Sequence, residues 1–198
     1  MTGHRALPAP VGLVLAGGES SRLGHDKARL EGATLTLGAV ERLAVVCAEV
    51  AVADRGRELV PGRLSLADGA GRGPVAGILG GAAGYPGRSV LVLACDLPRV
   101  PTGMLAELAR SAATDLLVPR WEGGLEPLCA FYGPAALAAL AARVREGRFS
   151  LHDLADDAGL AVRYLEGEAL RRFGDPGEIF FNLNTPGDLE RWREAKGT

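Results

Sequence analysis

Short apolar segments alternate with segments of helical spacing along most of the chain. Residues 11–15 form an apolar run that leads into glycines, and residues 89–94 are apolar on both faces. Runs of this kind are typical of parallel strands that are buried on both sides. The pattern predicts strands at residues 11–15, 49–53, 63–67, 89–94, 115–119, 128–132 and 161–165.

Helical spacing and helix-start signals occupy the intervals between these strands. Val40, Leu43 and Ala44 share one helical face, Pro74 suits a first helical turn, and Thr102 is a candidate N-cap. The predicted helices are residues 39–47, a helix from Pro74, and residues 102–112, 134–144, 151–158 and 186–196. Because strand and helix alternate over residues 11–120, the sequence predicts an α/β domain with a mostly parallel sheet.

Length, charge and cysteine usage exclude several broad classes. A chain of 198 residues suits one domain, here residues 11–198 after a proline-containing flexible leader over residues 1–10. A net charge of −2 argues against nucleic-acid binding through phosphate neutralisation. The sequence lacks both a signal peptide and the roughly 20 consecutive apolar residues of a membrane span. Cys47, Cys95 and Cys129 are unclustered, which predicts reduced thiols in a cytoplasmic protein.

The segment after the first predicted strand is rich in glycines and cations. Gly17 and Gly18 allow a tight turn and remove β-carbons that would block a phosphate, and Arg22 and Lys27 add positive charge. Ligands of parallel sheets bind beyond the carboxyl ends of the strands, so this segment is a candidate phosphate site. It matches neither the P-loop pattern nor the dinucleotide-binding pattern. The alternative interpretation is a solvated loop, with glycines for turning and charges for solubility.

Two aspartates stand close to the ends of predicted strands. Asp96 follows the strand at residues 89–94 and precedes Pro98, and Asp68 lies shortly before the helix that starts at Pro74. Mg²⁺ binds oxygen ligands and commonly joins one or two carboxylates to substrate phosphates, which makes Asp96 a candidate metal ligand. The alternative is that each aspartate only stabilises its own turn.

Residues 15–27 read Leu-Ala-Gly-Gly-Glu-Ser-Ser-Arg-Leu-Gly-His-Asp-Lys. This segment resembles the Leu-Ala-Gly-Gly-x-Ser-x-Arg-[Met/Leu]-Gly-x-Asp-Lys signature of the molybdenum cofactor guanylyltransferases, a family within the nucleotidyltransferase superfamily. Relatives that transfer cytidylyl or uridylyl groups more often read Leu-Ala-Ala-Gly. The resemblance implies a single three-layer α/β/α domain with a Rossmann-like, mostly parallel sheet.

The resemblance also implies roles for individual residues. Residues 95–98 match the family's Cys-Asp-x-Pro motif, and residues 73–77 resemble its Gly-Pro-Leu-Ala-Gly motif. The implied nucleotide contacts are Leu15, Ala16, Gly17, Gly18, Lys27, Asp68 and Asp96. Arg22, Lys27 and Asp96 are the implied catalytic residues, and Asp96 is the implied metal ligand. The chain departs from the family at Ala53, where relatives commonly present an asparagine that contacts the nucleotide.

Two further motifs lie in the second half of the chain. Residues 126–130 resemble an x-Pro-x-x-Ala motif of the same family, and residues 182–186 resemble its Asn-x-Asn-Thr-Pro motif. Asn182 and Asn184 would point to the same side of an extended segment, and their amides both donate and accept hydrogen bonds, as recognition of a pterin requires. They are therefore candidate acceptor-binding residues. The alternative is that Asn184 and Thr185 cap the helix predicted from Pro186.

Together these observations predict a Mg²⁺-dependent enzyme that transfers GMP from GTP to molybdopterin and releases pyrophosphate. One alternative is a cytidylyl- or uridylyltransferase that acts on another phosphorylated acceptor. The other is a non-catalytic nucleotide-binding protein of the same fold. The implied partners are the two small-molecule substrates and, transiently, cofactor-insertion proteins or molybdoenzymes, without nucleic acid or membrane.

Overall fold

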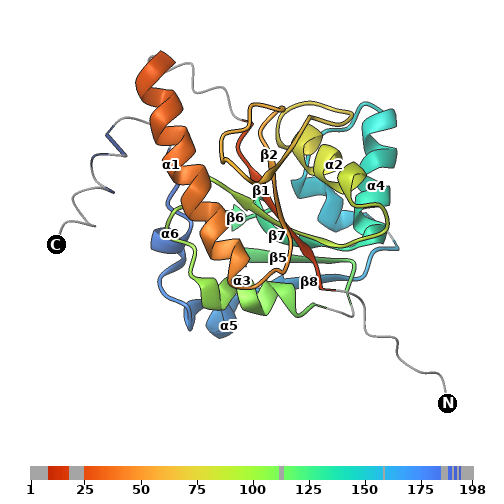
Figure 1. The fold of residues 1–198 in the computed structure, drawn as a ribbon. Helices are drawn as coiled ribbons and strands as arrows, with labels where there is room; N and C mark the ends of the chain where they lie inside the picture. Colours follow the sequence, from red (N-terminus) through yellow and green to blue (C-terminus); the bar gives the residue numbers. More distant parts are fainter. Residues whose placement is uncertain are drawn as a thin grey trace.

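In a computed structural model, the described residues form one mixed sheet with helices on both faces (Figure 1). The structure describes residues 9–17, 25–111, 114–157, 159–183, 187, 188, 190 and 192, and for residues 25–32 it describes the backbone only. The strands are β1 (Val11–Leu15), β2 (Val50–Ala53), β3 (Leu64–Leu66), β4 (Val90–Ala94), β5 (Leu116–Trp121), β6 (Gly124–Leu125), β7 (Cys129–Tyr132) and β8 (Val162–Leu165).

The strand order places six strand ends along one edge of the sheet. The order is β3-β2-β1-β4-β7-β5-β6, and β8 also pairs with β5. β1 is parallel to β2 and β4, β2 is parallel to β3, and β5 is parallel to β8. Because β7 is antiparallel to both β4 and β5, those two neighbours run in the same direction. The carboxyl ends of β1, β2, β3, β4, β5 and β8 therefore share one edge, as the predicted mostly parallel sheet requires.

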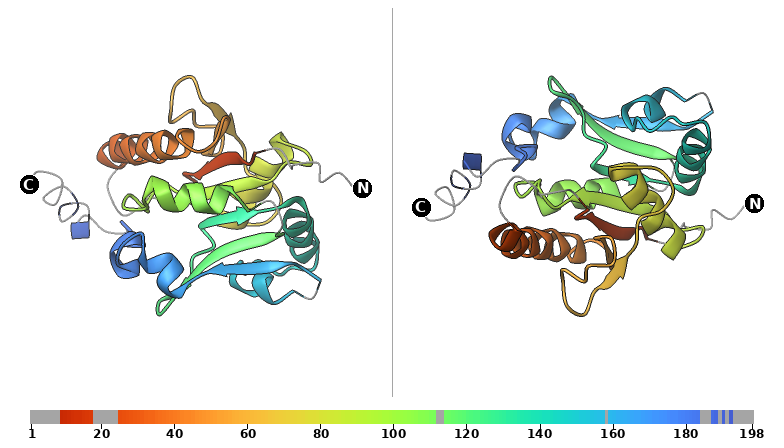
Figure 2. Two further views of the ribbon diagram at one scale, coloured as in Figure 1. Left: turned by 90° about the horizontal axis from the view of Figure 1, so that it is seen from below. Right: turned by 90° about the horizontal axis from the view of Figure 1, so that it is seen from above.

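The longer helices cover the two faces of the sheet in pairs. They are α1 (His25–Ala44), α2 (Pro74–Gly84), α3 (Thr102–Ala109) and α4 (Pro134–Arg145). Buried side chains of α1 and α3, such as Leu43 and Leu105, share one core with Leu91 of β4. On the other face, Ile78 of α2 and Leu140 of α4 pack against Val92 of the same strand. The predicted three-layer α/β/α arrangement is confirmed (Figure 2).

Glycines in α2 bring this helix unusually close to the sheet. A β-carbon added at Gly80 would lie 2.1 Å from the Ala67 carbonyl oxygen, and one added at Gly81 would lie 2.3 Å from the Leu13 side chain. Neither position has room for a larger residue without a shift of its neighbours. This close approach fixes the backbone that leads from β3 through Asp68 to the start of α2 at Pro74.

Several predicted elements differ from the observed ones. The first helix was predicted at residues 39–47, but α1 starts at His25. The prediction missed this part because Gly32, Gly38 and two threonines interrupt the apolar pattern. Thr102 is not the N-cap of α3; it is the first helical residue after Pro101, and no side-chain cap bond is seen among the described residues. The predicted helix at residues 151–158 is a 3-10 helix, η1 (His152–Asp156). β6, α5 (Gly167–Arg171) and α6 (Pro176–Ile179) were not predicted.

The chain ends are only partly described. Most of the predicted leader lies outside the described residues, although Pro10 is buried and the Ala9 carbonyl accepts a hydrogen bond of 2.8 Å from Arg88. The predicted helix at residues 186–196 also lies largely outside them. All three cysteines carry free thiols. Within the described residues, the structure contains no helix with the length and apolar character of a membrane span.

Candidate functional site

The glycine-containing segment after β1 lies at the shared carboxyl edge, tied to the ends of both neighbouring strands. The Ala16 amide donates to the Ala53 carbonyl at 3.0 Å, and the Cys95 amide donates to the Leu15 carbonyl, also at 3.0 Å. These bonds hold the ends of β1, β2 and β4 in one line. Leu15, Ala16 and Gly17, three of the predicted nucleotide contacts, therefore stand beside the residue that precedes Asp96.

Gly17 faces an ion pair that joins the ends of β2 and β3. A β-carbon added at Gly17 would lie 3.6 Å from Arg55 Nε, and the same nitrogen lies 3.0 Å from Asp68 Oδ2. The predicted contacts Gly17 and Asp68 are thus brought together, with Arg55 between them. Sequence reasoning missed Arg55, although its position directly after Asp54 at the end of a predicted strand was an available signal. Its φ of 62° is unusual for a residue with a side chain.

The segment after β2 has no asparagine, and its aspartate has a structural role. Ala53 is buried within β2. Asp54 is also fully buried, and it accepts hydrogen bonds from the Leu59 amide at 2.8 Å and from the Ser65 hydroxyl. Arg57 donates to the Asp54 carbonyl at 2.7 Å and to the Ala16 carbonyl. Because Asp54 is occupied by these hydrogen bonds, the polar side chains that remain after β2 include Arg55 and Arg57. Arginines offer only donors to a ligand, whereas an asparagine amide offers both a donor and an acceptor.

Asp96 and Asn182 meet at the centre of the edge. The Asn182 side chain donates a hydrogen bond to the Asp96 carboxylate, and the Leu183 amide donates to the Asp96 carbonyl at 3.0 Å. Burial raises the pKa of Asp96, and hydrogen bonds from the backbone and from Asn182 oppose this effect only in part. Within the described part of the chain, the Oδ1 atoms of both Asp96 and Asn182 are buried without a hydrogen-bond partner.

The loop that carries Asp96 is anchored from below by α1. Arg42 donates to the carbonyls of Leu97, at 3.1 Å, and Pro98, and burial lowers the pKa of this guanidinium. The neighbouring Cys95 thiol has a pKa raised to about 12, mainly by burial, so it stays protonated at neutral pH. Cys95 therefore contributes packing to the site and not a nucleophile.

Glu126 connects this centre to the β5 side of the edge. It precedes β7, and its carboxylate accepts a hydrogen bond of 3.3 Å from the Trp121 indole. Burial raises its pKa, and the charge of Asp96 adds to this increase, which places the two carboxylates within electrostatic reach of each other. Sequence analysis had singled out the motif around Glu126 but gave this residue no role.

A pocket of about 280 Å³ opens beyond Trp121, at the ends of β5 and β8. Its apolar lining comes from Trp121, Leu170 and Pro176. Its charged lining consists of Arg120, Glu122, Glu166 and Arg171. None of these residues was a predicted site residue, because they come from three separate stretches of sequence with no common spacing.

Some predicted site residues cannot be placed in this geometry. Gly18, Arg22 and Asn184 lie outside the described residues, so their predicted roles are not tested. Lys27 lies near the start of α1, and the structure describes only its backbone.

The residues around Asp96 suit a divalent cation that also binds a substrate. The described part of the chain holds no group of three or more His, Cys, Asp or Glu side chains arranged for a metal. It does offer two unpartnered buried oxygens, one from a carboxylate and one from an amide. Mg²⁺ takes oxygen ligands of this kind and is commonly held by one or two carboxylates together with substrate phosphates. Asp96, with Asn182 beside it, fits that chemistry.

Comparisons with known proteins find relatives over most of the chain. A family model described as a MobA-like NTP transferase domain matches residues 12–158. The probable molybdenum cofactor guanylyltransferase of Pelotomaculum thermopropionicum is 34% identical, over 92% of this chain and 91% of its own. The corresponding protein of Chloroflexus aggregans is 33% identical, over 94% and 95%. The crystal structure of molybdopterin-guanine dinucleotide biosynthesis protein A from Archaeoglobus fulgidus superimposes with a TM-score of 0.76 at 27% identity, covering 94% of this chain and 98% of that one.

Proposed function

Because the chain belongs to the MobA-like NTP transferase family, we propose that it transfers GMP from GTP to the terminal phosphate of molybdopterin and releases pyrophosphate. The observation that carries the proposal is the buried Oδ1 atom of Asp96, which lies on the same edge as Gly17 and has no hydrogen-bond partner in the part of the chain that the structure describes. A carboxylate that burial makes unfavourable, next to a turn suited to phosphate, is a site for a cation with its nucleotide. We propose Mg²⁺ as that cation and the cytoplasm as the compartment.

The reaction is an in-line displacement at the α-phosphorus of GTP. An oxygen of the acceptor phosphate forms a bond to that phosphorus while the bond to the bridging oxygen of the departing pyrophosphate breaks. The acceptor oxygen is already ionised, so the reaction does not require a strong general base. The protein therefore has to position the two substrates and to neutralise charge.

Each half of the edge has a part in this positioning. The amides of Gly17 and Gly18, with Arg22 and Lys27, would bind the phosphates of GTP. Asp96 would hold the metal, with the Asn182 hydrogen bond orienting its carboxylate. When bound, Mg²⁺ supplies positive charge to the reacting phosphates. Asp68, with its Arg55 partner, would contact the nucleotide on the β3 side of Gly17.

A thermal-shift panel tests the choice of nucleotide. GTP, CTP, UTP and ATP are each added with and without MgCl₂, and the expected result is that GTP with Mg²⁺ raises the melting temperature most. A larger shift with CTP or UTP would show that the enzyme uses that nucleotide in place of GTP. The test is needed because Ala53 stands where relatives commonly have an asparagine that contacts the nucleotide. No shift with any of the four nucleotides would contradict the proposed function.

Removal of one cation tests the phosphate site directly. Lys27→Ala should lower guanylyl transfer at least ~100-fold with little change in melting temperature, because the lost charge stabilises the transition state and not the fold. Lys196→Ala is the matched control, since Lys196 is the other lysine of the sequence. Equal activity of the two variants would remove Lys27 from the site.

A further inference from the structure

The pocket beside Trp121 stands at the same edge as Asp96 but on the side away from Gly17. β5 and β8 run parallel to β4 across the intervening β7, so their carboxyl ends reach this edge. Figure 2 shows α5 and α6, in blue, at one end of β5 and β8. Glu126 links the pocket to the metal-binding centre, because it accepts the Trp121 hydrogen bond and lies within electrostatic reach of Asp96.

Trp121, Leu170 and Pro176 give the pocket an apolar side. The Trp121 ring packs near the Phe180 ring, with centroids 6.0 Å apart, and its indole nitrogen is held by Glu126. A β-carbon added at Gly123 would lie 2.3 Å from the Trp121 ring, so the hairpin turn also fixes the ring in place. A ring held in this way offers a stacking surface for a planar ligand at little cost in side-chain entropy. The volume of about 280 Å³ suits one bicyclic ring.

Two ion pairs form the rim of the pocket. Arg120 Nε lies 2.5 Å from Glu166 Oε2, and Arg171 is paired with Glu122. All four side chains are 46–73% exposed, and ion pairs at such exposure contribute little to stability. They can therefore exchange partners for a ligand without loss of the fold.

A carboxylate next to a guanidinium can bind a heterocyclic edge that carries both donors and an acceptor. The 2-amino-4-oxopyrimidine edge has two N–H donors, which a carboxylate accepts together, and a carbonyl oxygen, which a guanidinium can bind. Two rings in the proposed reaction carry this edge, the guanine of GTP and the pterin of the acceptor. The predicted nucleotide contacts Gly17 and Asp68 lie on the opposite side of Asp96, which leaves the pocket at β5 and β8 to the acceptor.

We propose that this pocket binds the 2-amino-4-oxopteridine ring of the acceptor, stacked on Trp121 with its amino-oxo edge on the Arg–Glu pairs of the rim. The proposal rests on the proposed guanylyl transfer and names the part of the protein that selects the second substrate. The acceptor would then extend past Glu126 and present its phosphate to the α-phosphorus beside Asp96. Asn182 would thus act at the reacting phosphate, between the two subsites.

Tryptophan fluorescence can detect such binding without any turnover. The chain has two tryptophans, so Trp192→Phe leaves Trp121 as the single reporter. Titration with 6-carboxypterin in the absence of nucleotide should quench this emission to saturation. GTP with Mg²⁺ should raise the melting temperature of the same protein without abolishing the quenching by the pterin.

Carboxylate-to-amide variants locate the ligand in the pocket. Glu166→Gln and Glu122→Gln, made in the same background, should each raise the dissociation constant for the pterin about tenfold or more, because an amide cannot accept both ring donors. Glu168→Gln is the matched control, since Glu168 is an exposed carboxylate of α5 that does not line the pocket. The thermal shift with GTP should be the same in all three variants.

The possible failures are distinguishable. Pterin binding that is equal in the rim variants and the control, or no pterin binding by a protein that still responds to GTP, would overturn the pocket assignment alone. If GTP competes with the pterin, and if GTP binding is weaker in the rim variants, the pocket is the guanine site. That result would also overturn the assignment of the pocket to the acceptor. A protein that responds to neither ligand would overturn the proposed function itself.

Discussion

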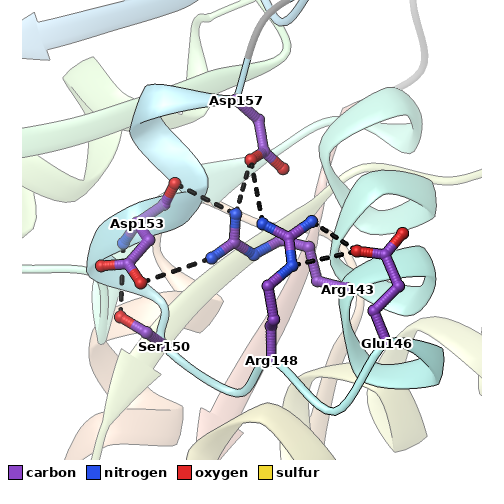
Figure 3. A network of polar contacts seen from close by, with 6 residues as sticks. All are labelled: Arg143, Glu146, Arg148, Ser150, Asp153 and Asp157. Atoms are coloured by element: carbon purple, nitrogen blue, oxygen red, sulfur yellow. Dashed lines mark hydrogen bonds and ion pairs between the residues drawn. The ribbon is translucent and has the colours of Figure 1, made fainter.

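The charged groups of Arg143 and Asp96 both have atoms withdrawn from water, but their surroundings are opposite. Arg143 of α4 is 2% exposed, and its guanidinium lies 2.5 Å from Asp157 Oδ1 and 3.5 Å from Asp153 Oδ2 (Figure 3). Arg148 joins the cluster at Asp157 Oδ1, at 4.0 Å, and pairs with Glu146 at 2.6 Å. Of the nitrogens in the Arg143 guanidinium, only Nε is buried without a hydrogen-bond partner among the described residues.

The Oδ1 atom of Asp96 is buried, and no cationic side chain among the described residues pairs with this carboxylate. Its partners are backbone groups and the Asn182 amide, and one of its oxygens has no partner among the described residues. A buried charge with charged partners holds the chain together, whereas a buried charge without one raises the free energy of the empty fold. Under the proposed function, we expect the Arg143 cluster to serve stability and Asp96 to serve a ligand that brings positive charge.

The largest expected effect is on stability, at the Arg143 cluster. Asp157→Ala should lower the free energy of unfolding by about 3 kcal/mol or more, because it leaves a buried guanidinium without its closest carboxylate. Arg143→Met should cost less, because it removes the buried charge and leaves two carboxylates that water already reaches. Urea denaturation measures both, and guanylyl transfer by the folded protein should be unchanged. A larger loss in Arg143→Met would contradict this account of the cluster.

At Asp96 we expect the opposite result, a loss of activity without a loss of stability. Asp96→Asn should lower turnover at least ~100-fold, because the amide removes the charge that holds the metal. Its melting temperature without metal should equal or exceed that of the parent, because an unfavourable buried charge is gone. Glu41→Gln, on the exposed face of α1, is the control for a carboxylate-to-amide change. Retained activity in Asp96→Asn would remove this residue from the metal site.

The pH dependence of stability follows from the same shift. The folded state raises the pKa of Asp96, so it binds this proton more tightly than the unfolded chain does. In the presence of a chelator, stability should therefore fall as the pH rises from the ordinary carboxylate pKa through the raised one. Asp96→Asn should flatten that fall, and the part that remains would report the raised pKa of Glu126. A stability that instead rises over this range in the parent, and not in the variant, would contradict the sign.

The sequence predicts most strands and the starts of α2, α3 and α4, but it misses the start of α1. β1 was predicted at its observed residues, and β4 and β7 each began within one residue of the prediction, because strands buried on both faces are continuous apolar runs. The start of α1 could not be found in this way, since glycines and threonines hide its periodicity.

The parts of the site also differ in how well the sequence predicts them. The glycine segment and the Asp96 loop are each continuous in sequence, so their motifs could be recognised. The Arg55–Asp68 pair and the Trp121 pocket join residues that only the fold brings together. The Oδ1 atom of Asp96, which is buried without a hydrogen-bond partner among the described residues, could be identified only from the three-dimensional structure.

A smaller effect is expected where a structural cation supports the functional loop. Arg42→Lys should lower turnover about tenfold, because a single ammonium cannot reach both the Leu97 and Pro98 carbonyls that the guanidinium binds. Stability should fall by about 1–3 kcal/mol, the range for buried acceptors left unsatisfied. The Mg²⁺ concentration at half-maximal activity distinguishes a displaced Asp96 loop, which raises it, from a general loss of stability, which does not.

The smallest effect separates two ion pairs that look alike. Arg55–Asp68 and Arg88–Glu49 both measure 3.0 Å and are both partly exposed, and they stand at opposite ends of the strands. Loss of the Arg55–Asp68 pair should change the free energy of unfolding by at most about 1 kcal/mol, and loss of the Arg88–Glu49 pair by a similar amount. Only Arg55→Ala should raise the KM for GTP, by up to about tenfold, because Asp68 then loses the partner that orients it beside Gly17. Equal KM values for Arg55→Ala and Arg88→Ala would show that this pair is no more than a surface contact.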